Sequence, residues 1–261
     1  MIGRTAQPRG GESQQGPVIV LAYAQAGAAQ LQRMLARDAA LACTSGTGVL
    51  PLCDLAAATW RQVDNRGGPL SGLAAASIRS MANSVITVIL ARAGKSRWCE
   101  ASFAPASRAE AFLELYPATK FICLHRCCLD VIIAGLQANP WGPADTPFGP
   151  YAAAYPGNSL ATMAAYWTSS TEALLQFQET HPAACCRLRY EDLIGNADAM
   201  PSEIATFLDL GPPDPSAPPW NRDQTPPQVD QVDQLPVDRI PLPLRTMIND
   251  LQKRLGYPPL T

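Results

Sequence analysis

The sequence predicts a single α/β domain with a mostly parallel sheet flanked by helices. Three short apolar runs predict buried strands: 18–22 (VIVLA), which is rich in β-branched residues, 121–124 (FICL) and 185–188 (CCRL). A helical pattern follows each run, and strands that alternate with helices normally pair in parallel. The length of 261 residues and the hydrophobic fraction of 47% suit one large core.

The other elements are expected in alternating order along the chain. After the first strand, Gly27 marks a turn, and the segment 28–42 (AAQLQRMLARDAALA) predicts a helix. Further helices are expected at 71–91, 107–116, 130–137, 159–178, 201–208 and 244–255, with a short strand at 98–101.

Residues 1–16 are polar and glycine-rich and predict a flexible leader, which leaves 17–261 as one domain. Residues 138–158 are rich in Pro, Gly and Ala and predict a long, lid-like loop. Aromatic residues in this loop suit either the wall of an apolar substrate pocket or simple packing of the loop; they are Trp141, Phe148, Tyr151 and Tyr155.

Composition excludes several classes of function. A net charge of −2 argues against a nucleic-acid surface. Eight cysteines without a CxxC pair, together with two histidines, argue against a metal site. No secretory signal and no apolar run of membrane-spanning length are evident, so we expect a cytoplasmic protein with reduced thiols and no membrane partner.

Three later segments carry a family resemblance. They are 121–136 (FICLHRCCLDVIIAGL), 189–210 (RYEDLIGNADAMPSEIATFLDL) and 235–260 (LPVDRIPLPLRTMINDLQKRLGYPPL). In order and rough spacing they resemble the signatures of sulfotransferases, nearest the tyrosylprotein-type and related bacterial branch. The resemblance runs from about Val18 to Pro258 and implies a P-loop-like sulfotransferase fold.

The resemblance implies transfer of a sulfuryl group from 3′-phosphoadenosine-5′-phosphosulfate (PAPS). The family's 5′-phosphate loop aligns with Gln25-Ala26-Gly27-Ala28-Ala29, which keeps the glycine but lacks the usual cation and hydroxyls. The family's 3′-phosphate arginine aligns with Arg126, while its partner serine falls at Ala134. We therefore expect Gln25, Gly27, Ala28, Ala29, Gln30 and Arg126 to form the cofactor site.

The general base expected from the family is also missing. No acid follows the first helix before Asp54, and the family's lysine near the short strand falls at Glu100 and Ala101. Glu100 and His125 are the candidate catalytic groups. For each the alternative is structural: an ion pair for Glu100 and a partly buried histidine for His125.

Two further segments leave alternatives open. Residues 44–48 (TSGTG) suit a second anion-binding turn or a plain loop, and the loop is slightly favoured. Tyr190, Glu191 and Asp192 are expected to hold the following turn and helix by hydrogen bonds.

Three functions follow. The first is a PAPS-dependent transfer to a hydroxyl or amine of a small metabolite or peptide, in bacterial specialised metabolism. The second is a repurposed sulfotransferase fold that no longer uses PAPS. The third is a non-catalytic binding protein. The missing cations strengthen the second and third, because charged contacts to phosphate normally contribute about 1.5–3 kcal/mol each. The first is kept as the leading hypothesis, because the resemblance along the whole chain is the only functional signal in the sequence.

Overall fold

A five-stranded, wholly parallel sheet forms the centre of the chain. The computed structural model describes residues 15–63, 68–101, 106–139, 147–195, 202–211 and 235–260. The strands are β1 (Val18–Leu21), β2 (Leu41–Thr44), β3 (Arg97–Glu100), β4 (Lys120–His125) and β5 (Cys185–Arg189). They lie in the order β2-β3-β1-β4-β5. The predicted fold class is confirmed.

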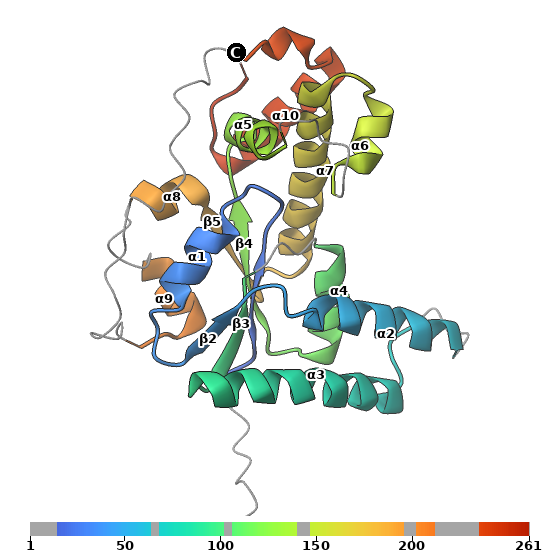
Figure 1. Cartoon of the computed structure of the whole chain (residues 1–261), viewed down its shortest axis with the longest axis vertical. Coiled ribbons are helices and arrows are strands. Elements are labelled where there is room, and N and C mark those ends of the chain that lie inside the picture. The colour runs from blue at the N-terminus through green and yellow to red at the C-terminus, as the bar shows by residue number, and fades with distance from the viewer. Residues whose placement is uncertain are drawn as a thin grey trace, which may run out of the picture.

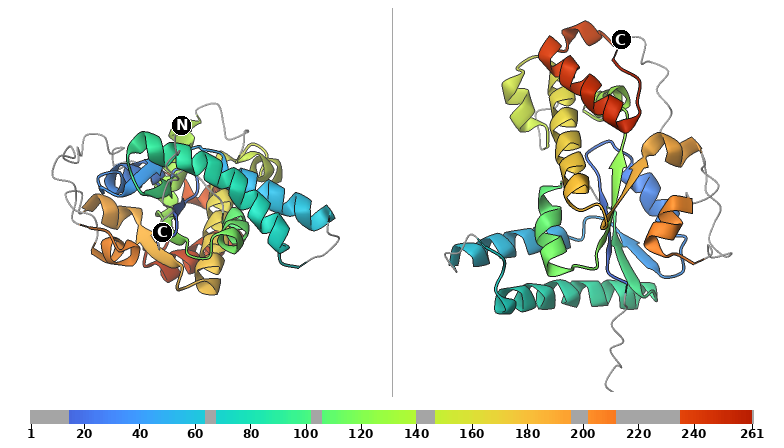
Figure 2. Two further views of the ribbon diagram at one scale, coloured as in Figure 1. Left: turned by 90° about the horizontal axis from the view of Figure 1, so that it is seen from below. Right: turned by 180° about the vertical axis from the view of Figure 1, so that it is seen from behind.

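Helices surround the sheet (Figure 1). They are α1 (Ala28–Leu35), α2 (Val49–Val63), α3 (Gly72–Ala93), α4 (Ser107–Leu115), α5 (Cys128–Ala138), α6 (Gly149–Ala154), α7 (Ser159–Thr180), α8 (Tyr190–Gly195), α9 (Ser202–Leu208) and α10 (Leu242–Leu255), with a short 3₁₀ helix, η3, at Val237–Arg239. Helices α5, α6, α7 and α10 gather at the carboxyl end of the sheet, and α3 lies across its amino end (Figures 1 and 2).

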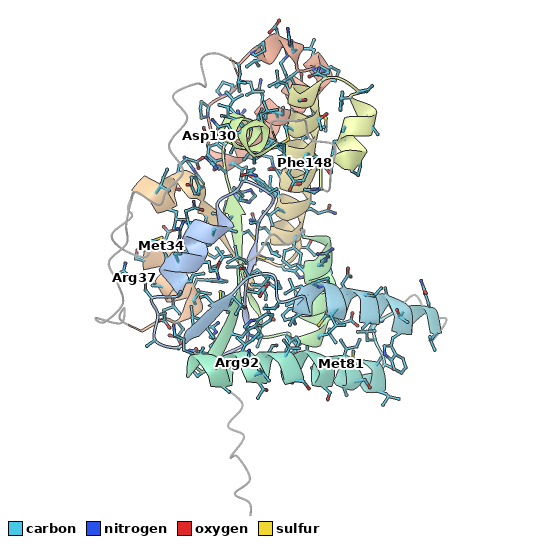
Figure 3. The ribbon with its side chains drawn as sticks, viewed as in Figure 1. Met34, Arg37, Met81, Arg92, Asp130 and Phe148 are labelled. Carbon is cyan, nitrogen blue, oxygen red and sulfur yellow. The ribbon has the colours of Figure 1, made fainter. Side chains whose placement is uncertain are left out.

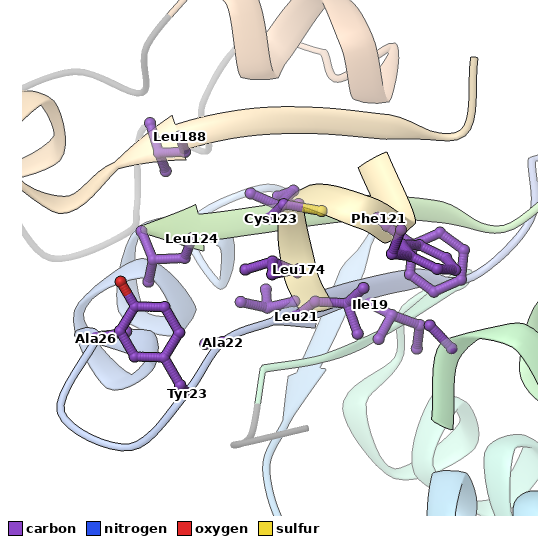
Figure 4. Packing of buried hydrophobic residues seen from close by; sticks show 14 of the residues in the cluster. Ile19, Leu21, Ala22, Tyr23, Ala26, Phe121, Cys123, Leu124, Leu174 and Leu188 are labelled. Atoms are coloured by element: carbon purple, nitrogen blue, oxygen red, sulfur yellow. The ribbon is translucent and has the colours of Figure 1, made fainter. Parts of the chain in front are cut away.

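The core forms around β1, whose four residues are all buried. Figure 4 shows Ile19 and Leu21 of β1 packed with Cys123 of β4 and Leu174 of α7. Because each fully buried Ile or Leu stabilises the fold by about 1.5–3 kcal/mol, this central strand anchors the turn that follows it. That turn is the one where phosphate-binding folds of this plan hold their ligand.

Helix α1 is shorter than the alanine-rich sequence predicted. It ends at Leu35, and the second half of the predicted helix 28–42 instead forms a turn and the edge strand β2. Asp38 causes the break, because its Oδ1 accepts hydrogen bonds from the backbone N–H of Ala40 at 2.8 Å and of Leu41 at 3.2 Å. Such a local side-chain bond competes with helix continuation.

Three α-helices were not expected from the sequence: α2, α6 and α8, the last of which follows β5 directly. Helix α2 begins at Val49, directly after the 44–48 turn, and Asp54 lies within it. Helix α6 lies inside the segment predicted as a lid-like loop. Residues 140–146 of that segment, including Trp141, lie outside the described residues, as do residues 1–14 of the predicted leader.

Candidate functional site

The turn between β1 and α1 has the backbone shape of an anion-binding turn. Gln25 and Gly27 both adopt left-handed conformations, with φ of 68° and 99°. Gly27 is the N-cap of α1, and its carbonyl accepts from Gln30 N at 3.0 Å. The first N–H groups of α1 therefore point out of the helix end, where the positive end of the helix dipole also lies. The structure thus places Gln25, Gly27, Ala28, Ala29 and Gln30 at the N-terminal end of α1, and their role in binding a cofactor stays a prediction.

Arg126 is clamped against this turn through its backbone and its side chain. The hydroxyl of Tyr23 donates to Arg126 O at 3.0 Å and accepts from Arg126 N at 2.8 Å. Trp167 Nε1 donates to the same carbonyl at 2.9 Å. The guanidinium donates from Nη1 to Gln25 O at 2.8 Å, and the residue is only 4% exposed. Arg126 therefore lies at the predicted site but is engaged by the protein itself.

Tyr23 and Trp167 were missed by sequence reasoning. Burial raises the pKa of Tyr23 well above its usual range, so its hydroxyl stays protonated and can donate to Arg126 O. A tyrosine in the loop and a tryptophan 41 residues beyond Arg126 carry no motif that would reveal this clamp. Only the packing of α7 against β4 brings Trp167 to Arg126.

The ring of Tyr190 closes the other side of the turn. Tyr190 opens α8 and is buried, and the Arg126 guanidinium lies 4.4 Å above its ring centroid. A Cβ added to Gly27 would lie 2.3 Å from Cδ2 and Cε2 of the Tyr190 ring. Glycine is thus required at position 27 both for its φ and for the close approach of the ring.

Acidic groups balance the positive charge around the turn. Burial raises the pKa of Asp130, and the nearby positive charge of Arg126 opposes that rise. The charges of Arg33, Arg126, Asp130 and Glu191 all act on Tyr190, so two cations and two acids share this region. Two charges of each sign make a poor site for a ligand that carries several negative charges.

Glu191 makes structural hydrogen bonds, but to segments distant in the sequence and not, as the sequence predicted, to the turn and helix that follow it. Its Oε1 accepts from Cys127 N at 2.9 Å, and its Oε2 accepts from the hydroxyl of Tyr257 at 2.7 Å. The carboxylate therefore ties the start of α5 to the segment after α10, next to Arg126.

Glu100 lies at the end of β3 and holds the 44–48 turn. Its carboxylate accepts from Thr44 Oγ1 at 2.9 Å, Thr47 N at 3.2 Å and Thr47 Oγ1 at 3.1 Å. The residue is buried. A turn whose N–H already binds a carboxylate does not suit a second anion, so the structure favours the plain loop. The catalytic role of Glu100 stays a prediction, and these contacts show that its carboxylate holds the 44–48 turn.

His125 is buried in a chain of hydrogen bonds behind the turn. Arg187 Nε donates to Gln178 Oε1 at 3.1 Å, so the amide nitrogen of Gln178 is the atom that faces His125 Nε2, at 2.9 Å. The Gln178 amide then donates, which leaves the imidazole proton on Nδ1. Burial lowers the pKa of His125 to about 3. This neutral histidine matches the structural alternative, and its role as a base stays a prediction.

The structure does not bring the two candidate catalytic groups together. Ile19 of β1 pairs with Glu100 on one side and with Phe121 on the other. His125 lies four residues beyond Phe121 along β4. At about 3.3 Å per residue and about 4.8 Å per strand spacing, the two Cα atoms are roughly 16 Å apart.

An aromatic cluster borders the turn on the α7 side. Tyr166 of α7 accepts from Ala24 N through its hydroxyl at 2.7 Å. Phe148 and Tyr151 pack edge-on against its ring, with centroids 4.9 Å and 5.6 Å away. Phe148 is buried, whereas Tyr151 and Tyr155 are half-buried. The predicted aromatic wall thus packs partly against itself, and Tyr166 links it to the turn.

A cavity of about 420 Å³ lies elsewhere, along the outer edge of β2. Its lining includes Cys43, Arg92 and Lys95. The Lys95 ammonium already donates to the carbonyls of Ala36, Asp38 and Leu41, at 2.8–2.9 Å. Because β3 and β1 separate β2 from β4, this cavity is remote from Arg126.

The comparisons with known proteins agree with this architecture. A model of the sulfotransferase family matches residues 17–214, more than half of the chain. The chain belongs to the sulfotransferase family. A search of curated proteins found no match to this chain.

Two solved sulfotransferase structures share its fold. The sulfotransferase domain of the Synechococcus PCC 7002 olefin synthase is 17% identical, with a TM-score of 0.51. The sulfotransferase of Alicyclobacillus acidocaldarius is 10% identical, with a TM-score of 0.55. Each alignment covers 94% of this chain and 97% of the other. At such identities the likeness concerns the fold alone.

The family usually uses PAPS, and the residues around the β1–α1 turn do not fit it. The aligned loop supplies no positive charge of its own. The Arg126 guanidinium already donates to Gln25 O and lies over the Tyr190 ring, and that ring packs against Gly27. The carboxylates of Glu191 and Asp130 offset the charges of Arg33 and Arg126 around Tyr190. The described part of this sulfotransferase-family site therefore lacks the charge that a PAPS site requires.

Proposed function

We propose that this sulfotransferase-family chain is a repurposed member that does not draw a sulfuryl group from PAPS. The observation that carries the proposal is the state of Arg126. Its guanidinium is buried, bonded to Gln25 O and stacked on Tyr190. For the 3′-phosphate of PAPS to bind, Arg126 would have to give up contacts that hold the turn together.

The site instead suits a small ligand with a single acceptor group. Arg126 Nε and the Tyr190 hydroxyl are both buried without a hydrogen-bond partner among the described residues. A buried donor without a partner costs about 1–3 kcal/mol, so one acceptor from a ligand would be favoured there. The ligand class that we propose is a small metabolite or peptide with at most one negative group.

PAPS-dependent sulfuryl transfer to a hydroxyl or amine is the second candidate. It is supported by the family match and by two retained features, the Gly27 turn and an arginine at position 126. The two candidate functions make opposite predictions about the binding of PAPS.

Binding can be tested by titrating the purified chain with PAPS and with adenosine 3′,5′-bisphosphate and measuring the heat of binding by calorimetry and the melting temperature by thermal shift. We expect no saturable heat and no rise in melting temperature up to about 1 mM, the level at which the binding free energy would be near −4 kcal/mol. Saturable binding below that level would contradict the proposal.

Two sets of variants sharpen the result. If PAPS does bind, Arg126→Ala should weaken it about 10- to 150-fold, whereas Arg92→Ala, at the opposite end of the sheet, should not. If PAPS does not bind because charge is missing, the quadruple change Gln25→Arg, Ala26→Ser, Ala28→Thr and Ala29→Thr should create measurable affinity. Turnover of any small molecule that binds the unmodified chain would then separate an enzyme from a binding protein.

A further inference from the structure

Two cysteines lie opposite each other on neighbouring strands at one edge of the sheet. Cys43 of β2 is paired with Cys99 of β3, and the two strands run parallel. The side chains of directly paired residues point to the same face of a sheet, and one strand spacing of about 4.8 Å separates their Cα atoms. Disulfides join Cα atoms that are about 4.4–6.8 Å apart, so the register holds Cys43 and Cys99 at a distance that a disulfide can bridge.

The two thiols contact each other but differ in their exposure. The Cys99 thiol is hydrogen-bonded to the Cys43 thiol. Cys99 is fully buried, whereas Cys43 is partly exposed. The bond to Cys43 and burial raise the pKa of Cys99, so Cys99 keeps its proton. A reagent from solution would therefore meet Cys43 first and find Cys99 directly behind it.

Cys43 lines the cavity of about 420 Å³ at the outer edge of β2, together with Thr44 and with Ile89 and Arg92 of α3. Figure 3 shows Arg92 at the end of α3 that lies beside β2 and β3. Small-molecule sites usually enclose about 300–1,000 Å³, so the cavity is large enough for a small reagent. It is separate from the Arg126 turn and from any ligand bound there.

The charged residues that line the cavity, among those that the structure describes, are Arg92 and Lys95. Three backbone carbonyls hold the Lys95 ammonium, whose positive charge remains at the wall. Helix α3 is apolar enough to pass for a membrane span by length and composition, and Arg79 and Arg92 are its charged residues. Arg92 is exposed and lies beside the apolar Ile89 and Ala93 in the cavity wall. These two cations favour a small molecule that carries carboxylates.

We propose that Cys43, Cys99 and this cavity form a thiol–disulfide exchange site for small disulfides that carry carboxylates. The thiolate of Cys43 attacks one sulfur of the small disulfide, which breaks its S–S bond and releases one half as a thiolate. Cys99 then loses its proton and attacks the Cys43 sulfur, which releases the other half. Two protein thiols are oxidised to one disulfide, and one small disulfide is reduced to two thiols. The protons of Cys43 and Cys99 pass to the two released thiolates.

A second thiol pair shows why register matters. Cys123 of β4 is hydrogen-bonded to Cys185 of β5. Cys185 is paired with Phe121, however, so it lies two residues out of register with Cys123. One strand spacing and two residues of rise place the two Cα atoms about 8 Å apart, beyond the limit of about 7 Å for a disulfide. Cys185 can therefore react with a small disulfide but cannot pass it on to Cys123.

The test follows the thiols of the full, reduced chain after it is mixed with one of three small disulfides. These are 3,3′-dithiodipropionate, which is anionic, 2-hydroxyethyl disulfide, which is neutral, and cystamine, which is cationic. The remaining thiols are blocked with iodoacetamide, and the chain is digested with trypsin without reduction. Cys43 and Cys99 fall on different tryptic peptides, 38–61 and 98–108, so mass spectrometry detects a bond between them. Fragmentation distinguishes Cys43 from Cys53 on the first peptide.

In the unmodified chain we expect a bond between Cys43 and Cys99, whereas Cys185 should stop at a mixed disulfide. Cys99→Ala should stop the reaction of Cys43 at the mixed disulfide, and Cys43→Ser should remove both products. Cys185→Ser is the matched control, because Cys185 is also a partly exposed strand cysteine with a buried thiol partner. This control should form the Cys43–Cys99 bond at the unmodified rate. A mixed disulfide that persists on Cys43 in the unmodified chain, or equal bridging of Cys123 and Cys185, would contradict the proposal.

The charge of the reagent tests the role of the cavity. Each rate constant at Cys43 is divided by that of the same disulfide with a neutral cysteine derivative, which removes differences in intrinsic reactivity. The anionic disulfide should then react about two- to fivefold faster than the neutral one, as an exposed ionic contact allows, and the cationic one should react more slowly. Arg92→Gln should reduce this preference to less than about twofold. Arg79→Gln, on the same helix but not among the residues that line the cavity, should keep it. Equal normalised rates for the three disulfides would overturn the proposed ligand class.

Discussion

Gly27 should be among the glycines least tolerant of substitution in this chain, and Gly27→Ala tests the packing of the turn directly. The residue combines two demands that a Cβ cannot meet. Its φ of 99° is a left-handed conformation, and its Cβ position lies 2.3 Å from two ring carbons of Tyr190. The Arg126 guanidinium and the hydrogen bond to Gln25 lie over that ring, so the ring cannot move without disturbing the turn.

The magnitude follows from these two effects. A left-handed alanine costs about 1–2 kcal/mol, and overpacking adds about 1–3 kcal/mol. Lower entropy of the unfolded chain offsets about 0.4–1 kcal/mol. The free energy of unfolding should therefore fall by about 1–4 kcal/mol, which lowers the melting temperature by roughly 3–15 °C for a domain of this size.

Urea denaturation and calorimetry measure this change, and Gly46→Ala is the control. Gly46 has a similar left-handed φ of 67° but open space around its Cβ position, so only the conformational cost of about 1–2 kcal/mol applies. In a Tyr190→Ala background, the cost of Gly27→Ala should drop to that of Gly46→Ala. The reasoning fails if Gly27→Ala costs no more than Gly46→Ala, or costs the same with and without the Tyr190 ring.

Two further predictions concern the candidate catalytic groups. Burial lowers the pKa of His125 to about 3 in the folded chain. Below pH 6.5 the imidazole is therefore protonated in the unfolded chain but stays neutral in the folded one. The contribution of His125 to the free energy of unfolding is complete above pH 6.5 and falls as the pH drops, by about 2 kcal/mol at pH 5. His125→Gln should remove this pH-dependent loss, which urea titrations at pH 7 and pH 5 measure. A variant with the same pH slope as the unmodified chain would contradict the prediction. Glu100→Gln should lower the free energy of unfolding by about 1–2 kcal/mol, because the charged partner of Thr44 and Thr47 is lost. If Glu100→Gln instead lost turnover while keeping the free energy of unfolding of the unmodified chain, Glu100 would be a catalytic residue.

Local signals in the sequence were enough for much of the fold. The apolar runs at β1 and β4 are short, partly β-branched or aromatic, and bounded by turns, so their strand character is encoded locally. The run at β5 has no β-branched or aromatic residue and is marked only by its short apolar stretch. The segment after Leu35 was harder, because its alanines favour a helix and are uncommon in strands. Pairing with β3 makes Leu41–Thr44 a strand, and such pairing involves residues far along the chain.

The candidate site divides in the same way. Gly27 and Arg126 were identified from the sequence because a turn glycine and a residue after a strand have positions that a motif can mark. Tyr23, Trp167 and Tyr166 were not, since nothing in their local sequence shows what their polar atoms bond.

By itself, the sequence determined the family, the parallel α/β plan and the absence of the loop cation and hydroxyls, because these depend on residue types and their order. Only the tertiary structure decided how Arg126 is used. Its partners Gln25, Tyr190 and Trp167 come from three separate segments and meet it only after β1, β4, β5 and α7 have packed. The lack of a loop cation can be read from the sequence, whereas the contacts that engage Arg126 can be seen only in the folded structure.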